Sequence, residues 1–247
     1  EAANLSMVGW SYFFLNEFER ALAAGAEAVN VGQKISHYRA EIVAHHIIAE
    51  VNYNLGNFEL TKDEYKQASK LEDIIKTNVF EAQRFHKLGL IAHNEGDHSL
   101  AMNLLEKAED SCRNHGMEFA GPAILGGIAE VTKDPVRRKN ALQEAQKLLE
   151  KGARHQTYFI FYRHAIDACL NNDDWDSVDR YANALESFTK PEPLPWSDFF
   201  IKRGRMLAAL GRGQRDEKIQ QELKALHEQA LRVGMNLVIP SLERAMM

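Results

Sequence analysis

Small residues recur along the chain at a constant interval of 40. Gly9, Ala49 and Gly89 follow one another at this spacing (89 − 49 = 49 − 9 = 40), and Ala129 continues the series. Two further series share the interval, namely Ala21, Thr61, Ala101 and Ala141, and Ala28, Ala68 and Ala108. Such a period predicts an array of similar structural units, each resting on its neighbours, instead of one irregular globule.

Each unit has the layout of a helical hairpin. An amphipathic stretch with one small residue precedes a short turn, and a second amphipathic stretch with two small residues follows it. The first three turns read Asn16-Glu17-Phe18, Gly56-Asn57-Phe58 and Gly96-Asp97-His98. Small side chains let two antiparallel helices cross closely, glycine can take φ > 0 after the first helix, and Asn or Asp caps the second. Because one hairpin leaves an apolar face uncovered, the pattern predicts stacked hairpins.

The later units drift but keep this layout. Asp134-Pro135 predicts a helix start, with proline at the first helical position. The fifth hairpin is predicted to turn at 172–175 and the sixth at 210–213, with a last long helix ending at Gly234. We expect one all-α domain over residues 1–247, with hairpins at about 1–36, 37–77, 78–116, 117–152, 153–189 and 195–235 and a terminal helix at 238–246. The proline-rich stretch 190–195 predicts a rigid loop between hairpins, with a domain boundary as the alternative.

Composition and charge limit the class of protein and the cellular compartment that we expect. The chain of 247 residues is 45% hydrophobic and 26% charged, which is near the globular average, and its formal charge of −5 gives no reason to expect nucleic acid or a membrane surface. Cys112 and Cys169 lie far apart without a CxxC pair, which predicts buried thiols in a reducing compartment. No apolar run approaches the ~20 residues of a membrane span. We therefore expect a cytoplasmic protein, and the start at Glu1 without Met suggests a fragment of a longer chain.

The units resemble the tetratricopeptide repeat. Its signature is a small residue in the first helix, an aromatic residue three positions later, a Gly/Asn/Asp turn and two small residues in the second helix. The matching residues are Gly9, Tyr12, Asn16, Phe18, Ala21 and Ala28 in the first unit, and Leu88, Gly89, Gly96, Asp97, Ala101 and Ala108 in the third. The second unit departs at Asn52 and Thr61, and the usual repeat has 34 residues. The resemblance implies a right-handed superhelix of about six hairpins.

A second resemblance concerns the C-terminal part. The stretch Pro195–Phe200, continuing through Gly204-Arg205 to Leu210–Gly213, is similar to the C-terminal part of class III adenylate/guanylate cyclases that carry a regulatory ATPase module. This implies a regulatory region of a bacterial multidomain signalling protein, whose catalytic carboxylates would lie upstream. The chain has no phosphate loop, HExxH, GxSxG or EF-hand motif, so we expect no enzyme activity.

Histidines and basic residues are the other candidates for chemistry. His46, His86 and His93 could approach one another in a stack and hold zinc, but no carboxylate is placed as a further ligand, so we predict no metal and no cofactor. A basic cluster comprises Lys202, Arg203, Arg205, Arg212 and Arg215. We interpret this cluster as a solvated face, with contact to an acidic partner segment as the alternative. Trp175, Phe199 and Phe200 are predicted to pack in the core.

The tetratricopeptide resemblance also implies a binding groove. In that family, inward positions follow the small residue by one and four places and precede it by three. Carried over, they are Ser6, Trp10, Phe13, His46, Glu50, Tyr53, His86, Leu90, His93, Glu130, Arg163, Asp167, Leu170 and Arg205. All of them except Ser6 and Leu170 are the predicted partner-binding residues. The lysine and asparagine clamp of chaperone-binding repeats is missing, since Ser6 and Trp10 stand at its first two places.

These observations predict a non-catalytic protein-interaction or regulatory module. Its partner would be a protein or peptide segment, including upstream domains of the same polypeptide, without nucleic acid or membrane, and a homo-oligomer is compatible with the sequence. One alternative is a ligand- or peptide-sensing domain coupled to an effector such as a cyclase or a transcription regulator. Another is an enzyme of unrecognised type. A closed pocket with convergent polar groups would favour the sensor, and an open groove the interaction module.

Overall fold

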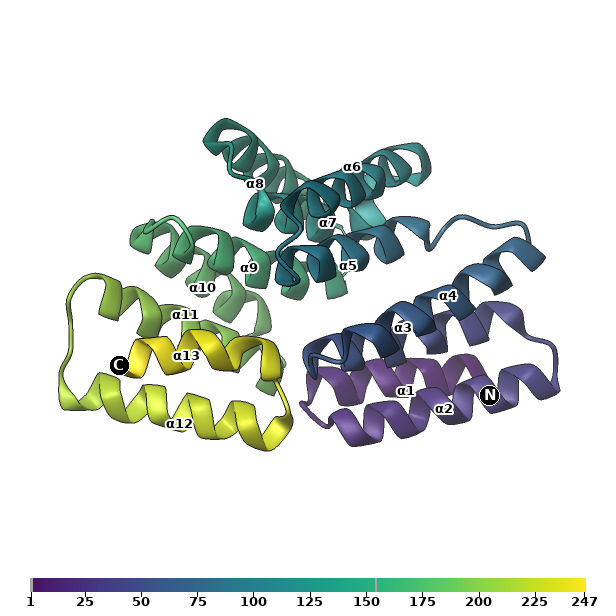
Figure 1. Cartoon of the computed structure of the whole chain (residues 1–247), viewed down its shortest axis with the longest axis horizontal. Helices are drawn as coiled ribbons and strands as arrows, with labels where there is room; N and C mark the ends of the chain where they lie inside the picture. Colours follow the sequence, from purple (N-terminus) through teal and green to yellow (C-terminus); the bar gives the residue numbers. More distant parts are fainter. Residues whose placement is uncertain (1, 154) are drawn as a thin grey trace. The chain divides into compact units, whose positions relative to one another are not determined.

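The computed structural model describes residues 2–153 and 155–247, and these residues form helices and connecting turns (Figure 1). The helices are α1 (Ala2–Phe14), α2 (Phe18–Lys34), α3 (Tyr38–Asn54), α4 (Phe58–Ile74), α5 (Glu81–Asn94), α6 (His98–His115), α7 (Met117–Val131), α8 (Pro135–Glu150), α9 (His155–Leu170), α10 (Trp175–Thr189), α11 (Pro195–Gly211), α12 (Glu217–Val233) and α13 (Ile239–Met246), with a 3₁₀ turn η1 (Asn236–Val238) before α13. The all-α prediction is therefore confirmed for the described residues.

The recurrent small residues lie where paired helices cross. A Cβ atom added to Gly89 on α5 would lie 3.1 Å from the carbonyl oxygen of Ala101 on α6 and 2.9 Å from Cγ of Leu105. The equivalent place in the second hairpin holds Ala49 and Thr61, and the Thr61 hydroxyl donates to the Ala49 carbonyl at 3.4 Å. Close backbone approach thus explains why these positions carry Gly, Ala or Thr.

The turns repeat the 40-residue period in their backbone angles. Positive φ occurs at Asn16, Gly56 and Gly96, directly after the first helix of each early hairpin, with values of 62°, 78° and 87°. The joints between hairpins show the same interval at Ser36, Lys76 and Gly116. Asp173 and Gly213 are again 40 residues apart. The left-handed conformation is therefore a property of the unit, present also where the sequence has no glycine.

Aspartates at the predicted helix starts act as N-caps. Asp97 accepts a hydrogen bond from the Leu100 amide at 2.9 Å, and Asp134 accepts one from the Val136 amide at 2.8 Å. Pro135 is the first residue of α8, which confirms the predicted Asp-Pro start. These caps fix α6 and α8 to their turns, whereas Asn57, at the equivalent place before α4, makes no side-chain capping bond, contrary to the prediction.

The chain divides into two compact units. The first contains Glu1–Phe80, Leu194–Trp196 and Leu223–Met247, so that it joins α1–α4 to the end of α12, η1 and α13. Consecutive helices pair within it, and α3 also packs against α1 and α2. The end of α12 lies beside the turns of the first two hairpins (Figure 1), where the Asn236 side-chain amide donates to the Leu55 carbonyl at 2.8 Å. Segments from opposite ends of the sequence thus share one unit.

The second unit contains Glu81–Pro193 and Ser197–Glu222. In it α5 pairs with α6, α7 with α8 and α9 with α10, while α7 also packs against α5, α6 and α9 (Figure 1). One passage of the chain between the units falls in the proline-rich stretch, after Pro193. The single domain, the sixth hairpin and the right-handed superhelix concern the whole chain and stay predictions.

Candidate functional site

Most of the predicted partner-binding residues of the first unit contact their own protein. Phe13 is buried in an aromatic cluster in which its ring centroid lies 5.5 Å from that of Phe18 and 6.2 Å from that of Trp196. His46 and Tyr53 are also buried, whereas Trp10 and Glu50 are partly exposed. Trp196 of the same chain therefore packs against Phe13, a residue that the sequence analysis assigned to partner binding.

In the second unit, several predicted residues meet in a buried ion network. Its members come from the first helices of successive hairpins: Glu130 on α7, Arg163, His164 and Asp167 on α9, and Arg203 on α11. Arg203 Nη1 lies 2.5 Å from Asp167 Oδ1, and Arg163 Nε lies 3.1 Å from Asp167 Oδ2. Asp167 thus receives two guanidinium groups, and Arg163 also lies 3.8 Å from Glu130.

Two glycines on α7 make room for the histidines beside this network. A Cβ atom on Gly127 would lie 2.5 Å from His86 Nε2, and one on Gly126 would lie 2.9 Å from His164 Cβ. The rings of His86 and His164 therefore approach to 5.2 Å between centroids. His46 belongs to the first unit, and the grouping of three histidines that the sequence raised is not formed: within residues 2–153 and 155–247 no three His, Cys, Asp or Glu side chains are placed to hold a metal ion.

Burial sets the protonation of both rings. Burial lowers the pKa of His86 well below its usual value, and His164, Lys87 and Arg163 act in the same direction. Its Nε2 atom is buried without a hydrogen-bond partner. Burial, followed by Arg163, also lowers the pKa of His164. Its Nδ1 atom lies 2.5 Å from Glu130 Oε2 and 3.2 Å from Arg163 Nη1.

The remaining predicted residues lie apart from the network. Leu90 is 1% exposed and packs in the core, and His93 is partly exposed near the end of α5. Arg205 pairs with Glu186 of α10 at 2.7 Å. The sequence analysis missed His164 and the buried role of Arg203. The signal for Arg203 was its distance of 40 residues from Arg163, which is the period of the earlier hairpins.

The prediction that the C-terminal basic cluster forms a solvated face is wrong for Arg203 only, since Lys202, Arg212 and Arg215 are exposed and Arg205 is partly exposed. Arg203 is 7% exposed because its guanidinium pairs with Asp167. Arg212 turns instead to Asp176 and Asp179 of α10, at 2.9 and 2.8 Å. Carboxylates on other helices thus pair with three members of the cluster, Arg203, Arg205 and Arg212.

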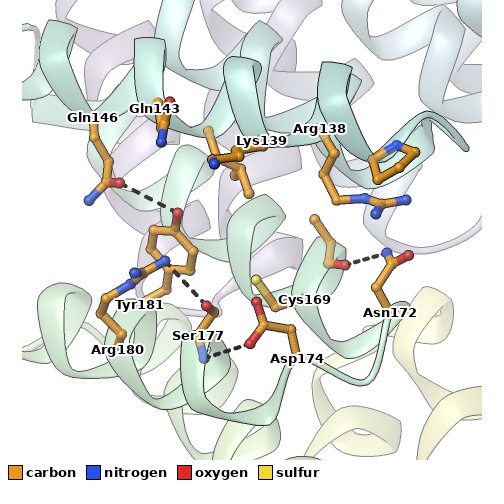
Figure 2. A pocket seen from close by; sticks show the side chains of 13 residues that line it. Arg138, Lys139, Gln143, Gln146, Cys169, Asn172, Asp174, Ser177, Arg180 and Tyr181 are labelled. Carbon is orange, nitrogen blue, oxygen red and sulfur yellow. Dashed lines mark hydrogen bonds between the residues drawn. The ribbon is translucent and has the colours of Figure 1, made fainter.

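A pocket of about 490 Å³ lies between α8 and the α9–α10 hairpin (Figure 2). From α8, Arg138 and Gln146 extend toward the hairpin, and Lys139 and Gln143 lie between them along the helix. The Tyr181 hydroxyl donates to the Gln146 side-chain oxygen at 3.5 Å across the pocket. Polar groups from three helices therefore converge on one concave surface.

Among the described residues, the cations of this pocket have no carboxylate partner. Arg138 Nη2 donates to the Thr132 carbonyl at 3.0 Å, and its Nε is buried without a hydrogen-bond partner. Arg180 donates to the Ser177 hydroxyl at 3.2 Å and lies over the Tyr181 ring at 4.8 Å. No salt bridge of the described residues engages Arg138, Lys139 or Arg180.

Two arginines on α6 and α8 that do not line the pocket pair with carboxylates instead. Arg137, the neighbour of Arg138 on α8, pairs with Glu106 at 2.6 Å. Arg113 on α6 pairs with Glu109 at 2.6 Å and with Glu144 at 2.9 Å. The lining carboxylate of the pocket, Asp174, caps α10 by accepting from the Ser177 amide at 3.2 Å (Figure 2). The pocket thus has a local excess of positive charge within a chain of net negative charge.

Burial disfavours ionisation of Cys169 and Tyr181, which also line the pocket. Burial, with Asp174 nearby, raises the pKa of the Cys169 thiol to about 12. Burial also raises the pKa of Tyr181. Both cysteines are free and buried, as predicted, and a thiol with a raised pKa is a poor nucleophile at neutral pH. The pocket is suited to binding by charge and hydrogen bonds.

No protein-family model, curated protein or solved structure matches the chain. The resemblances to tetratricopeptide repeats and to cyclase regulatory regions therefore stay predictions. Among the described helices, none combines the length and the apolar character needed to cross a lipid bilayer.

Proposed function

We propose that this chain is a non-catalytic protein-interaction or regulatory module that binds a segment of a partner protein. The observation that carries the proposal is the pocket between α8, α9 and α10, in which polar side chains from two adjacent hairpins converge. Stacked hairpins bring such side chains together because each hairpin leaves a groove against the next. The pocket now takes the place of the predicted inward row, since Phe13, His46, Tyr53, His86, Leu90 and Asp167 are buried.

The proposal is tested by selecting peptides from a displayed random library against the whole chain. The selected peptides should lose affinity for Gln143→Trp, since an indole at this exposed pocket residue would fill the space without changing the charge. Gln33→Trp places the same ring at an exposed position on α2 and should leave binding unchanged. A library that yields no binder, or binders indifferent to Gln143→Trp, contradicts the proposal.

A second candidate function is the sensing of a small ligand. The volume of about 490 Å³ lies within the range of small-molecule sites, and several hydrogen-bonding groups line the pocket. A ligand that binds the folded chain raises its melting temperature. Screening metabolites by thermal shift, with Gln143→Trp as the variant that should lose the effect, tests this candidate.

A further inference from the structure

The charge of the α8–α10 pocket carries information about its occupant. Arg138, Lys139 and Arg180 contribute three positive charges against the single carboxylate of Asp174. That carboxylate already accepts the Ser177 amide, and the salt bridges of the described residues leave all three cations without an acidic partner. Uncompensated cations beside a concave surface attract groups of opposite charge.

We propose that the pocket binds an acidic peptide segment of a partner protein through its aspartate or glutamate carboxylates. This inference rests on the proposed function and adds the chemistry of the partner. The guanidinium groups of Arg138 and Arg180 offer donors in the planar geometry that matches a carboxylate. Lys139, exposed on α8, adds a third charge beside them.

The lining favours a carboxylate segment over a nucleic acid. Binding of single-stranded nucleic acid generally uses aromatic rings on which bases stack, and Tyr181, which lines the pocket, is only 2% exposed. The chain also carries a net charge of −5, which disfavours a long polyanion beyond the immediate reach of the three cations. A short acidic stretch places its charge where the cations are.

The test uses the full chain and fluorescein-labelled synthetic peptides. One peptide repeats Glu-Ser-Gly, a matched peptide repeats Gln-Ser-Gly, and a third carries phosphoserine in place of each Glu. Fluorescence anisotropy measures their binding. We expect the Glu peptide to bind more tightly than the Gln peptide and to weaken as salt is added, because the attraction between charges is screened.

Substitutions that remove one positive charge each locate the binding site. Arg138→Gln, Lys139→Gln and Arg180→Gln should each weaken the Glu peptide by about tenfold or more, the loss expected for a charge-assisted hydrogen bond. Arg137→Gln removes the adjacent arginine of α8, which is paired with Glu106, and should leave the affinity unchanged. Circular dichroism checks the fold of Arg138→Gln, whose side chain also bonds to Thr132. Lys139→Gln is the second variant because Lys139 is exposed.

Each contrary result has its own meaning. Equal binding of the Glu and Gln peptides, or loss on Arg137→Gln as large as on Lys139→Gln, overturns the acidic-segment inference. If library peptides still lose affinity with Gln143→Trp, the proposed function stands in that case. If only the phosphoserine peptide binds, the inference of a carboxylate ligand is overturned and the pocket binds phosphate groups instead. A failed library selection, together with no binding of the Glu peptide, rejects both proposals.

Discussion

Lowering the pH should destabilise this protein through His86. Its ring is buried against Gly127 and faces His164 and Arg163 from α9 and Lys87 from its own helix. Because these surroundings disfavour a charged ring, the pKa of His86 is lower in the folded chain than in the unfolded one. The stabilisation from the neutral ring is therefore present above the unfolded pKa and is lost as pH falls toward the folded pKa.

The size of the effect follows from proton linkage. The unfolded ring has a pKa of about 6.5 and takes up a proton as the pH falls, whereas the folded ring stays neutral until its own lower pKa is reached. Between about pH 7 and pH 5 one such histidine removes about 2 kcal/mol from the free energy of unfolding, if the folded ring does not titrate in that range. The loss begins near the unfolded pKa and steepens below it.

Urea denaturation at several pH values measures this contribution. Groups remote from His86 titrate alike in the wild type and in His86→Gln, so the stability difference between the two proteins reports the His86 ring together with its interaction with His164, 5.2 Å away. We expect this difference to shift against the wild type between about pH 7 and pH 5, by at most about 2 kcal/mol. His98→Gln removes a histidine outside the network and serves as the matched control. A pH-independent difference for His86→Gln would refute the reasoning.

Three further predictions concern packing and backbone. Gly127→Ala should destabilise by about 1–3 kcal/mol, and by less in a His86→Ala background, because the new methyl meets that ring at 2.5 Å; a double-mutant cycle by urea denaturation measures this. Ala101→Leu should overpack the helix crossing and lower the stability of the fold by about 1–3 kcal/mol, whereas Lys107→Leu on an exposed face should change the melting temperature little. Equal shifts in melting temperature would contradict the placement of Ala101 at a helix crossing. Lys76→Gly should leave the melting temperature unchanged or higher because φ is 52° there, while Lys107→Gly within α6 should cost about 1 kcal/mol; equal losses in both would show that the backbone at Lys76 is unstrained.

The hairpin boundaries were predictable because their causes are local. The start of α8 at Asp134-Pro135 follows from capping and from the fixed φ of proline, and α12 ends before Gly234 because glycine takes the φ of 83° found there. The crossings at Gly89 and Ala101 were readable because a period of 40 residues repeats the same packing constraint. Each of these signals lies within a few residues or one repeat.

The sequence could not predict which polar residues pair. Arg203 follows Lys202 and precedes Arg205 by two positions, so its local pattern indicates an exposed basic stretch. The buried partner, Asp167, lies 36 positions earlier on another helix. Arg138 and Arg137 are neighbours, yet one lines the pocket and the other pairs with Glu106. The face of the helix on which a side chain lies, together with the helix packed against that face, decides which partner the side chain finds.

By itself, the sequence determined a set of helical hairpins with capped turns and small residues at their crossings. Only the tertiary structure decided that Trp196 packs beside Phe13 and that the Asn236 amide reaches the Leu55 carbonyl. Such contacts join segments more than a hundred residues apart and follow no repeat, so they leave no periodic signal. They form because apolar rings and unpaired backbone carbonyls at one end of the chain find matching groups at the other, and folding removes both from water.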